Sequence, residues 1–263
     1  MGIKVRKVYG QTHTMVPTKR LRKFGVPPGG PLDPYTCNIA RSSLLRPYDS
    51  PMIEVKGTLE FEATRAMTIC WMTPFGGYTK PMKKYEIQRV CCLGEFAGYL
   101  GFTYEILPER GLVGLFEPMK QLRFLPIHHR LPFDVRTTMD ISRMGFRCES
   151  SLSGVPAHDV SEPICPGMLQ LTPSGQVIII GPDGPVTGGY HKLGVVIEAD
   201  LPFLATMLPL TEYEFIPVNM EEALSARKEL HLEAKKRQKL IEIVQARTSD
   251  PIRYQRLIAE YRK

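Results

Sequence analysis

Short runs of apolar, β-branched and aromatic residues, separated by turns rich in glycine and proline, recur along most of this chain. Examples are MIEVKGTLEFEA at 52–63, QVIII at 176–180 and KLGVVIEA at 192–199. Runs of this length and composition favour strands over helices. They recur about every ten residues, a spacing typical of a barrel or sandwich and not of alternating strands and helices. The sequence therefore predicts a mainly β protein.

Turn signals interrupt these runs at defined places. In 52–63 apolar and charged residues alternate until Gly57 and Thr58 break the phase, which predicts a bulge or tight turn there. Pro173-Ser174-Gly175 and Pro182-Asp183-Gly184 each separate two strand-like runs. Both triplets are typical of hairpin connections, because glycine accepts a positive φ and Pro-Asp-Gly favours a type I turn.

Two helices are predicted inside the β-rich body, and a third region is helical as a whole. Asp33 followed by Pro34 is a typical helix start, and Asp200 with Pro202 repeats the pattern. From 219 to 263 charged residues dominate and only a thin apolar stripe remains, which predicts a helical tail. The tail lies on the barrel, or it binds a partner or a nucleic acid. We expect an N-terminal β lobe at 1–119, a β-barrel lobe at 120–219 and the charged tail at 220–263.

The basic charge of this chain belongs to its ends. Residues 1–24 hold seven basic side chains and no acid, residues 220–263 hold eleven basic and seven acidic ones, and the whole chain has a formal charge of +7. A nucleic-acid-binding protein would concentrate such charge on one face, so this pattern argues against that class. The chain has no apolar run long enough for a membrane span and no secretory signal, and its six cysteines form no CxxC pair. We therefore expect a cytoplasmic protein with reduced thiols, no membrane partner and no metal site.

Two glycine-rich turns carry candidate site residues. In GVPPGGPLDP, Gly29, Gly30 and the start of the helix that Asp33 caps can receive an anion or a nucleotide, because backbone amides and a helix N-terminus attract negative charge. The alternative is a rigid turn without a ligand. In GPDGPVTGGYHK the pair Gly188-Gly189 allows a positive φ or a close ligand approach. Polar side chains surround that pair (Asp183, Thr187, Tyr190 and Lys192), and a plain hairpin loop remains the alternative.

The segment SRMGFRCES adds Arg143, Arg147 and Glu149. On a single strand these alternate positions would point to one face. Arginine binds carboxylate and related groups through a bidentate fork, so the segment suits recognition of such a substrate. A solvated strand face with internal ion pairs is the competing interpretation.

Four segments in order resemble the carboxyltransferase A/B-type domain family. They are GVPPGGPLDPYTCNIA at 25–40, SRMGFRCE at 142–149, the long stretch 161–209 and VNMEEA at 218–223. Within 161–209 the shared elements are Ser161-Glu162, Pro166-Gly167, Gln170, Asp183 and Thr187 to Tyr190. This family includes the C component of 5-oxoprolinase, allophanate hydrolase subunit 2 and an antagonist of a sporulation-kinase inhibitor. The resemblance implies two cyclophilin-like β-barrel lobes with a few short helices; after about residue 64 the first lobe diverges from the family.

The resemblance also implies a function that needs other chains. It predicts a counterpart of the C component in an ATP-dependent 5-oxoprolinase complex, with a C/D-type carboxyltransferase subunit and a lactam-utilisation subunit as partners. ATP with Mg would bind at the level of the complex, and any biotin would come from another chain. Our candidate catalytic residues are Glu149, Asp183 and Lys192. Candidate substrate-binding residues are Arg143, Arg147, Gln170, Thr187, Gly188, Gly189 and Tyr190.

Two other functions remain open on the sequence. The chain can be a non-catalytic regulatory module that binds a kinase-inhibitor-type partner. It can also be the carboxyltransferase lobe of a urea carboxylase or allophanate-type system, acting on a small molecule with biotin supplied by another chain.

Overall fold

The computed structural model describes residues 2–15, 19–47, 49–92, 97–114, 119–157, 160–249 and 251–261. The chain forms two compact units. The first comprises Met1–Val16, Asp33–Glu117 and Leu230–Lys263, and the second comprises Pro17–Leu32 and Pro118–Glu229. This grouping differs from the sequence division at two places, because residues 17–32 join the second unit and the helical tail divides between the two.

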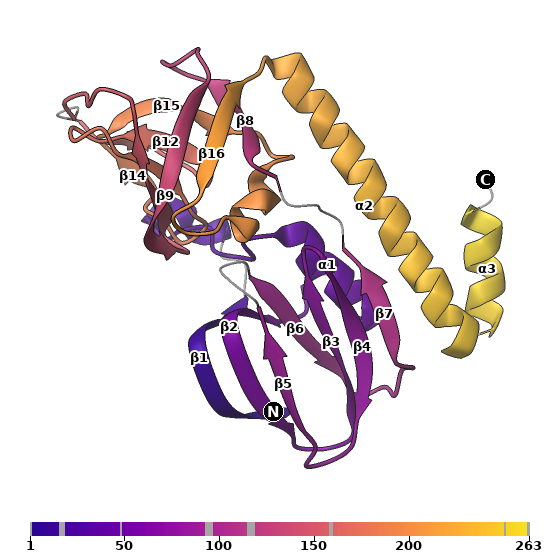
Figure 1. Ribbon diagram of the computed structural model, residues 1–263. Helices are drawn as coiled ribbons and strands as arrows, with labels where there is room; N and C mark the ends of the chain where they lie inside the picture. The colour runs from indigo at the N-terminus through magenta and orange to yellow at the C-terminus, as the bar shows by residue number, and fades with distance from the viewer. Residues whose placement is uncertain are drawn as a thin grey trace. The chain divides into compact units, whose positions relative to one another are not determined.

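The first unit is built on one antiparallel sheet (Figure 1). Its strands are β1 (Ile3–Met15), β2 (Met52–Ala63), β3 (Met67–Thr73), β4 (Gly76–Met82), β5 (Ile87–Cys91), β6 (Gly98–Thr103) and β7 (Arg110–Val113). Among the described strands the order is β1-β2-β6-β3-β4-β7, with β5 also paired to β2. Helix α1 (Pro34–Ser43) packs against this sheet at β3 and β6. The sheet therefore has two ends, at β1 and β7.

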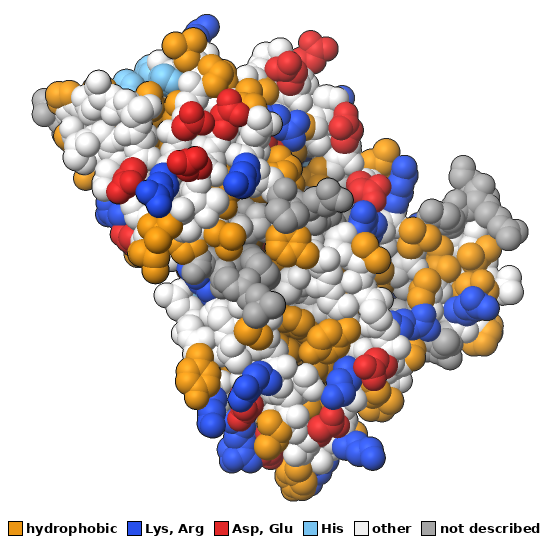
Figure 2. Space-filling model, viewed as in Figure 1, with side chains coloured by type: hydrophobic (Ala, Val, Ile, Leu, Met, Phe, Trp, Pro, Cys, Tyr) orange, Lys and Arg blue, Asp and Glu red, His pale blue; other side chains and the backbone are white. Residues whose placement is uncertain are grey.

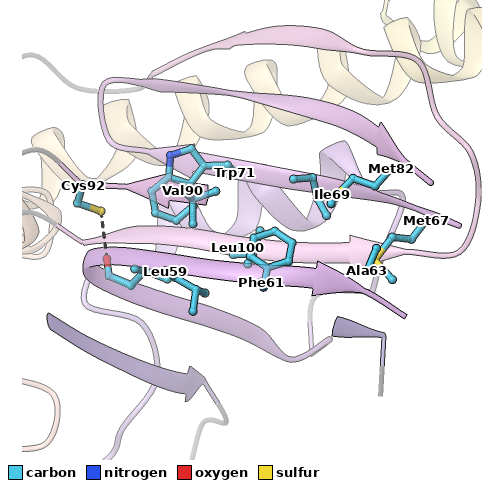
Figure 3. Packing of buried hydrophobic residues seen from close by; sticks show 11 residues of the cluster. Leu59, Phe61, Ala63, Met67, Ile69, Trp71, Met82, Val90, Cys92 and Leu100 are labelled. Carbon is cyan, nitrogen blue, oxygen red and sulfur yellow. Dashed lines mark hydrogen bonds between the residues drawn. The ribbon is translucent and has the colours of Figure 1, made fainter. Parts of the chain in front are cut away.

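Alternation along β2 builds the core of the first unit. Leu59 and Phe61 point into a cluster that also holds Ile69, Trp71 and Leu100 (Figure 3). Near this cluster the thiol of Cys92 donates to the carbonyl of Val55 across 3.1 Å. The period-two pattern of the sequence is thus realised as one buried face and one polar face.

The predicted break at Gly57 takes a different form from a turn. β2 continues through Gly57, which lies opposite Gly10 of β1. Both glycines have a positive φ, +118° for Gly10 and +97° for Gly57. A Cβ on Gly57 would lie 2.2 Å from the carbonyl oxygen of Tyr9, and a Cβ on Gly10 would lie 2.1 Å from that of Lys56. The two paired strands approach each other here at a distance that only glycine allows.

The second unit is a closed barrel of seven strands in the order β10-β13-β12-β15-β8-β16-β9. These strands are β8 (Gln121–Pro126), β9 (Phe133–Ser142), β10 (Gly145–Ser150), β12 (Met168–Leu171), β13 (Val177–Ile180), β15 (His191–Val196) and β16 (Glu212–Pro217). A two-stranded ribbon of β11 (Glu162–Pro163) and β14 (Thr187–Gly188) accompanies them. Phe124, Phe133 and Phe215 pack in the barrel, with ring centroids 5.3–6.5 Å apart. The prediction of a mainly β fold is confirmed. Of the two barrel lobes expected, the second unit is a closed barrel, whereas the described strands of the first unit form an open sheet.

The two predicted capping aspartates behave differently. Asp33 accepts hydrogen bonds from the amides of Tyr35 and Thr36 at 2.9 and 3.0 Å and so caps α1. Asp200 makes no side-chain cap, and the segment that follows it is the 3-10 helix η2 (Leu201–Thr206). Its buried carboxylate instead binds the guanidinium of Arg123 at 2.6 and 3.1 Å, and this ion pair raises the pKa of Arg123. A 3-10 helix η1 (Lys19–Phe24) also belongs to this unit.

The helical tail consists of α2 (Met220–Ser249) and α3 (Pro251–Tyr261). Asn219 and Glu222 form a reciprocal capping box, with two side chain–amide bonds of 2.9 Å. Further along, buried Gln245 donates to the carbonyl of Ser43 at 3.0 Å, so the later part of α2 docks on α1. The later part of α2 therefore packs on α1 of the first unit, and not on the barrel as the sequence alternative had it. No helix in the described residues is long and apolar enough to cross a bilayer.

We expect Gly57→Ala to lower the free energy of unfolding by about 1–3 kcal/mol, because a side chain at this φ is strained and meets the backbone of Tyr9. Urea denaturation followed by circular dichroism measures this change. Gly111→Ala is the matched control, since a Cβ on Gly111 meets nothing within 4 Å. Equal stabilities of the two variants would contradict the close approach of the two strands at Gly57.

Candidate functional site

An ion pair between Arg143 and Asp183 ties three loops of the second unit together. The Arg143 guanidinium donates to both carboxylate oxygens of Asp183, at 2.7 and 2.8 Å, and to the carbonyl of Gly30 at 2.8 Å. Backbone hydrogen bonds reinforce this arrangement. The amide of Asp183 donates to the carbonyl of Arg143, and the amide of Gly29 donates to the carbonyl of Pro182, each at 3.0 Å. Only 11% of the Arg143 side chain is exposed. The structure thus brings together four of the predicted site residues.

Arg147 and Glu149 lie elsewhere. Arg143 sits in the turn between β9 and β10, so it shares no strand face with them. In β10 the buried residues are Phe146 and Cys148, which leaves Arg147 and Glu149 exposed on the outer face of the barrel. Arg147 pairs with exposed Asp140 at 2.8 Å. The expectation of a single Arg-Arg-Glu face is therefore wrong, and Arg147 follows the alternative of a solvated face with internal ion pairs.

A second cluster forms around Gln170. This residue lies on β12 opposite Lys192 of β15, next to a bulge in the pairing of the two strands. Its side chain is buried, and its Nε2 has no hydrogen-bond acceptor among the described residues. Lys192 donates to the carboxylate of Glu162 at 2.5 Å. Glu162 in turn lies opposite Gly188 in the β11–β14 ribbon.

Gly188 has a steric role in this cluster. A Cβ at this position would come within 3.0 Å of Nε2 of Gln170 and 3.3 Å of Ile164. Neither Gly188 nor Gly189 is among the glycines of the described residues with a positive φ. Close approach to two side chains, and not an unusual backbone conformation, is therefore what favours glycine at 188. The side chains of Thr187 and Tyr190 are exposed at the rim of this cluster.

Sequence reasoning missed three residues near Gln170. The signal was available for two of them, because Glu162 belongs to the Ser161-Glu162 element of the family resemblance and Cys165 directly precedes the Pro166-Gly167 element. Burial raises the pKa of the Cys165 thiol, while the charges of Arg22 and Lys192 act in the opposite direction. Arg22 donates to the carbonyl of Ile164, and nothing in the sequence indicated that contact. No three His, Cys, Asp or Glu side chains gather as a metal site in the part of the chain that the structure describes.

The predicted anion turn is occupied by the chain itself. The amide of Gly29 donates to Pro182, that of Asp33 to the hydroxyl of Tyr99 at 2.7 Å, and those of Tyr35 and Thr36 to the Asp33 carboxylate. Gly29 and Gly30 belong to the second unit and Asp33 to the first. An anion at this turn would have to displace these acceptors.

The Gln170 cluster suits recognition of a carbonyl group. Gln170 offers a buried donor, and Lys192, with 11% of its side chain exposed, places a positive charge across the strand pair from it. A donor and a cation that converge on one oxygen polarise its carbonyl, most strongly where water is excluded. The Arg143–Asp183 pair holds the start of the loop whose end carries Gly188.

Comparison with known proteins supports the family resemblance over part of the chain. Residues 130–217 match the family described as carboxyltransferase domain, subdomain A and B. The chain is 34% identical over 91 residues to the C component of 5-oxoprolinase from Escherichia coli (strain K12), and 38% identical over 88 residues to that from Haemophilus influenzae. These matches cover 34% and 33% of this chain and 29% and 28% of the relatives, so the chain matches less than a third of their length.

Solved structures share the fold over most of the chain. The urea carboxylase of Kluyveromyces lactis superposes with a TM-score of 0.73 at 16% identity, over 90% of this chain and 29% of that one. The protein TTHA0988 gives a TM-score of 0.66 at 18% identity, over 83% of this chain and 55% of that one. At such identities the likeness establishes the fold, and it confirms the fold class expected from the sequence.

We expect Arg143→Gln to destabilise the second unit by about 3 kcal/mol, because Asp183 and the carbonyl of Gly30 lose a shared, largely buried donor. Thermal and urea unfolding measure the loss. Arg147→Gln is the matched control and should change stability by less than about 1 kcal/mol, since its ion pair is exposed. If both variants have the same stability, the hydrogen bonds of Arg143 are not what holds these loops.

Asp33 should make stability depend on pH. Burial raises the pKa of its carboxyl from 3.8 to about 7. The folded chain therefore binds a proton that the unfolded chain releases between these values, and this contribution to stability is lost as pH rises from about 4 through 7. Asp33→Asn keeps a capping oxygen without the charge. Urea denaturation midpoints measured from pH 4 to 8 should show that the stability of Asp33→Asn relative to the wild type increases as pH rises. Parallel profiles of the two proteins would contradict this.

Proposed function

We propose that this protein is a subunit of an ATP-dependent enzyme complex that opens a cyclic amide, 5-oxoproline, to glutamate. The observation that carries the proposal is the buried amide of Gln170, whose Nε2 has no acceptor among the described residues and which faces Lys192 across the barrel strands. Both residues lie in the segment 130–217 that matches the carboxyltransferase family. Relatives of that segment are named as the C component of 5-oxoprolinase.

Opening a lactam requires that its carbonyl be polarised. In the proposed site Gln170 would donate a hydrogen bond to the carbonyl oxygen, and Lys192, its partner across the strand pair, would favour negative charge there. Both interactions strengthen as charge develops on the oxygen, which is how such groups lower a barrier. Thr187 and Tyr190, at the exposed rim, would orient the substrate over Gly188.

The acids divide into two roles. Glu162 holds the Lys192 ammonium by an ion pair of 2.5 Å, and its side chain is half-exposed. Both oxygens of Asp183 accept from Arg143, so we assign this pair a positioning role in place of the catalytic role first expected for Asp183. Glu149 and Arg147 point to solvent on the outer barrel face and take no part in the proposed chemistry.

ATP with Mg, when bound, would supply the phosphoryl group that activates the lactam oxygen. The glycine turn at Gly29 does not fit the nucleotide, because its amide and the α1 cap amides already donate within the chain. We therefore place the nucleotide on a partner subunit and derive no step through it. The expected partners are a C/D-type carboxyltransferase subunit and a lactam-utilisation subunit, in a cytoplasmic complex.

A second candidate is carboxyl transfer. It is favoured by the TM-score of 0.73 with the urea carboxylase of Kluyveromyces lactis, a likeness of fold. The biotin for such a reaction would come from another chain. Transfer of labelled bicarbonate to urea by a reconstituted complex distinguishes this candidate from lactam opening. A regulatory module without chemistry is the third, and it predicts partner binding that is unaffected by substitutions at Gln170.

The test is reconstitution with the two partner subunits. We expect phosphate release from ATP that depends on 5-oxoproline in the complex, and none from this chain alone. Gln170→Leu keeps the volume of the side chain but removes the donor, and should lower kcat about 100- to 1,000-fold. Arg147→Gln, on the outer face, should retain the wild-type rate.

Two results would contradict the proposal. One is a stable complex in which 5-oxoproline does not stimulate ATP hydrolysis. The other is a Gln170→Leu complex as active as the Arg147→Gln control. Co-purification with the partner subunits verifies that each variant still assembles, so that a loss of rate reports on chemistry.

A further inference from the structure

Strand β1 forms an open edge of the sheet in the first unit. It pairs with β2 along its length, and no other described strand pairs with it. All residues from 4 to 11 are exposed, and they include three large side chains, Val5 at 52%, Val8 at 41% and Tyr9 at 63%. A strand of this kind leaves one row of backbone donors and acceptors available to a further strand. Figure 2 shows basic side chains beside hydrophobic ones over this edge, at the lower left.

The two faces of β1 differ in chemistry. Val5 and Val8 lie opposite Phe61 and Leu59, which face the core, so the two valines continue the core face to the sheet edge. On the other face Lys4 and Lys7 lie opposite Glu62 and Glu60. A strand added to β1 would therefore meet apolar side chains on one face and cations on the other.

The acids of β2 do not neutralise these lysines. Arg6 binds Glu62, and Arg89 binds Glu60 at 3.0 Å. The described residues supply no ion-pair partner for Lys4 or Lys7. No acid occurs anywhere in residues 1–24. The free side of β1 is therefore cationic on one face, and half-exposed valines lie on the other.

Charge decides which strand fits this edge. A second copy of β1 would place lysines against lysines, which destabilises a strand pair. Such lysines, together with the bulge at Arg6, are also what keeps an edge from pairing with others of its kind. We propose that β1 binds an extended acidic segment of a partner protein, in which Glu or Asp alternates with apolar residues, as an added strand.

β2 supplies the pattern for this partner. Its segment Leu59 to Glu62 alternates apolar and acidic residues and already pairs with the inner side of Val5, Lys7 and Val8. Opposite residues in neighbouring strands share a face, so the same alternation suits the outer side. This surface belongs to the first unit, whereas the Gln170 cluster belongs to the second, so the proposal does not depend on the proposed reaction.

A labelled peptide tests the proposal on the full chain. The probe is a capped peptide of about ten residues in which glutamate alternates with valine or threonine, and its counterpart carries lysine in place of glutamate. We expect fluorescence anisotropy to detect binding of the glutamate peptide, weaker at high salt, and little binding of the lysine peptide. Amide hydrogen exchange should show new protection in β1 when the glutamate peptide is bound.

Variants make the test specific. Lys4→Gln with Lys7→Gln should weaken binding of the glutamate peptide about threefold to thirtyfold, the range expected for two cross-strand ion pairs. Lys235→Gln with Lys236→Gln removes the same charge from the exposed side of α2 and should leave the affinity unchanged. Equal binding of the two peptides, equal affinity of the two double variants, or protection outside β1 would each overturn the proposal. Tighter binding of a single-stranded oligonucleotide than of the glutamate peptide would overturn it as well.

Discussion

The second unit depends on how the guanidinium of Arg143 is shared. One side chain from the β9–β10 turn satisfies both oxygens of Asp183 and the carbonyl of Gly30, so three loops that are distant in sequence lose their freedom together. The planar fork of arginine makes this possible, since it donates in two directions at once while it remains charged. A lysine would reach one of these acceptors at a time. The loop that begins at Asp183 therefore has a fixed origin, although it is rich in glycine and proline.

That fixed origin explains how the Gln170 cluster is held. The same loop ends in β14, whose pairing with β11 sets Gly188 opposite Glu162. With both ends fixed, the backbone at Gly188 can lie against the buried Gln170 amide with no side chain between them. Lys192 follows on the next strand, where it meets Glu162. The cluster is thus assembled mostly by strand pairing, and few of its members need side-chain contacts with one another to stay in place.

Local signals in the sequence predicted local structure well, but they did not predict contacts between residues far apart in the chain. Asp33 before Pro34 acts within one helical turn and forms the expected cap, and the Asn219–Glu222 box is equally local. Asp200 has the same local signal, but a distant partner, Arg123, takes its carboxylate. Arg143 and Arg147 were placed on one face because a turn between them could not be seen in the spacing. Gln170 was found through the family resemblance and Lys192 through its place beside the Gly188-Gly189 turn, whereas Arg22 had no signal at all, because its partner lies 142 positions away.

The unpaired donor of Gln170 has a consequence for how this protein can change over time. A buried amide nitrogen that finds no acceptor, as that of Gln170 finds none in the described parts of the chain, lowers the stability of the folded state by about 1–3 kcal/mol, and a well-packed apolar residue would not carry that penalty. Selection for stability alone would therefore favour leucine or methionine at this position, whereas selection for function would keep glutamine. The residue at 170 can thus serve as a marker, across natural or laboratory-evolved variants, of whether the barrel is still selected for what it binds.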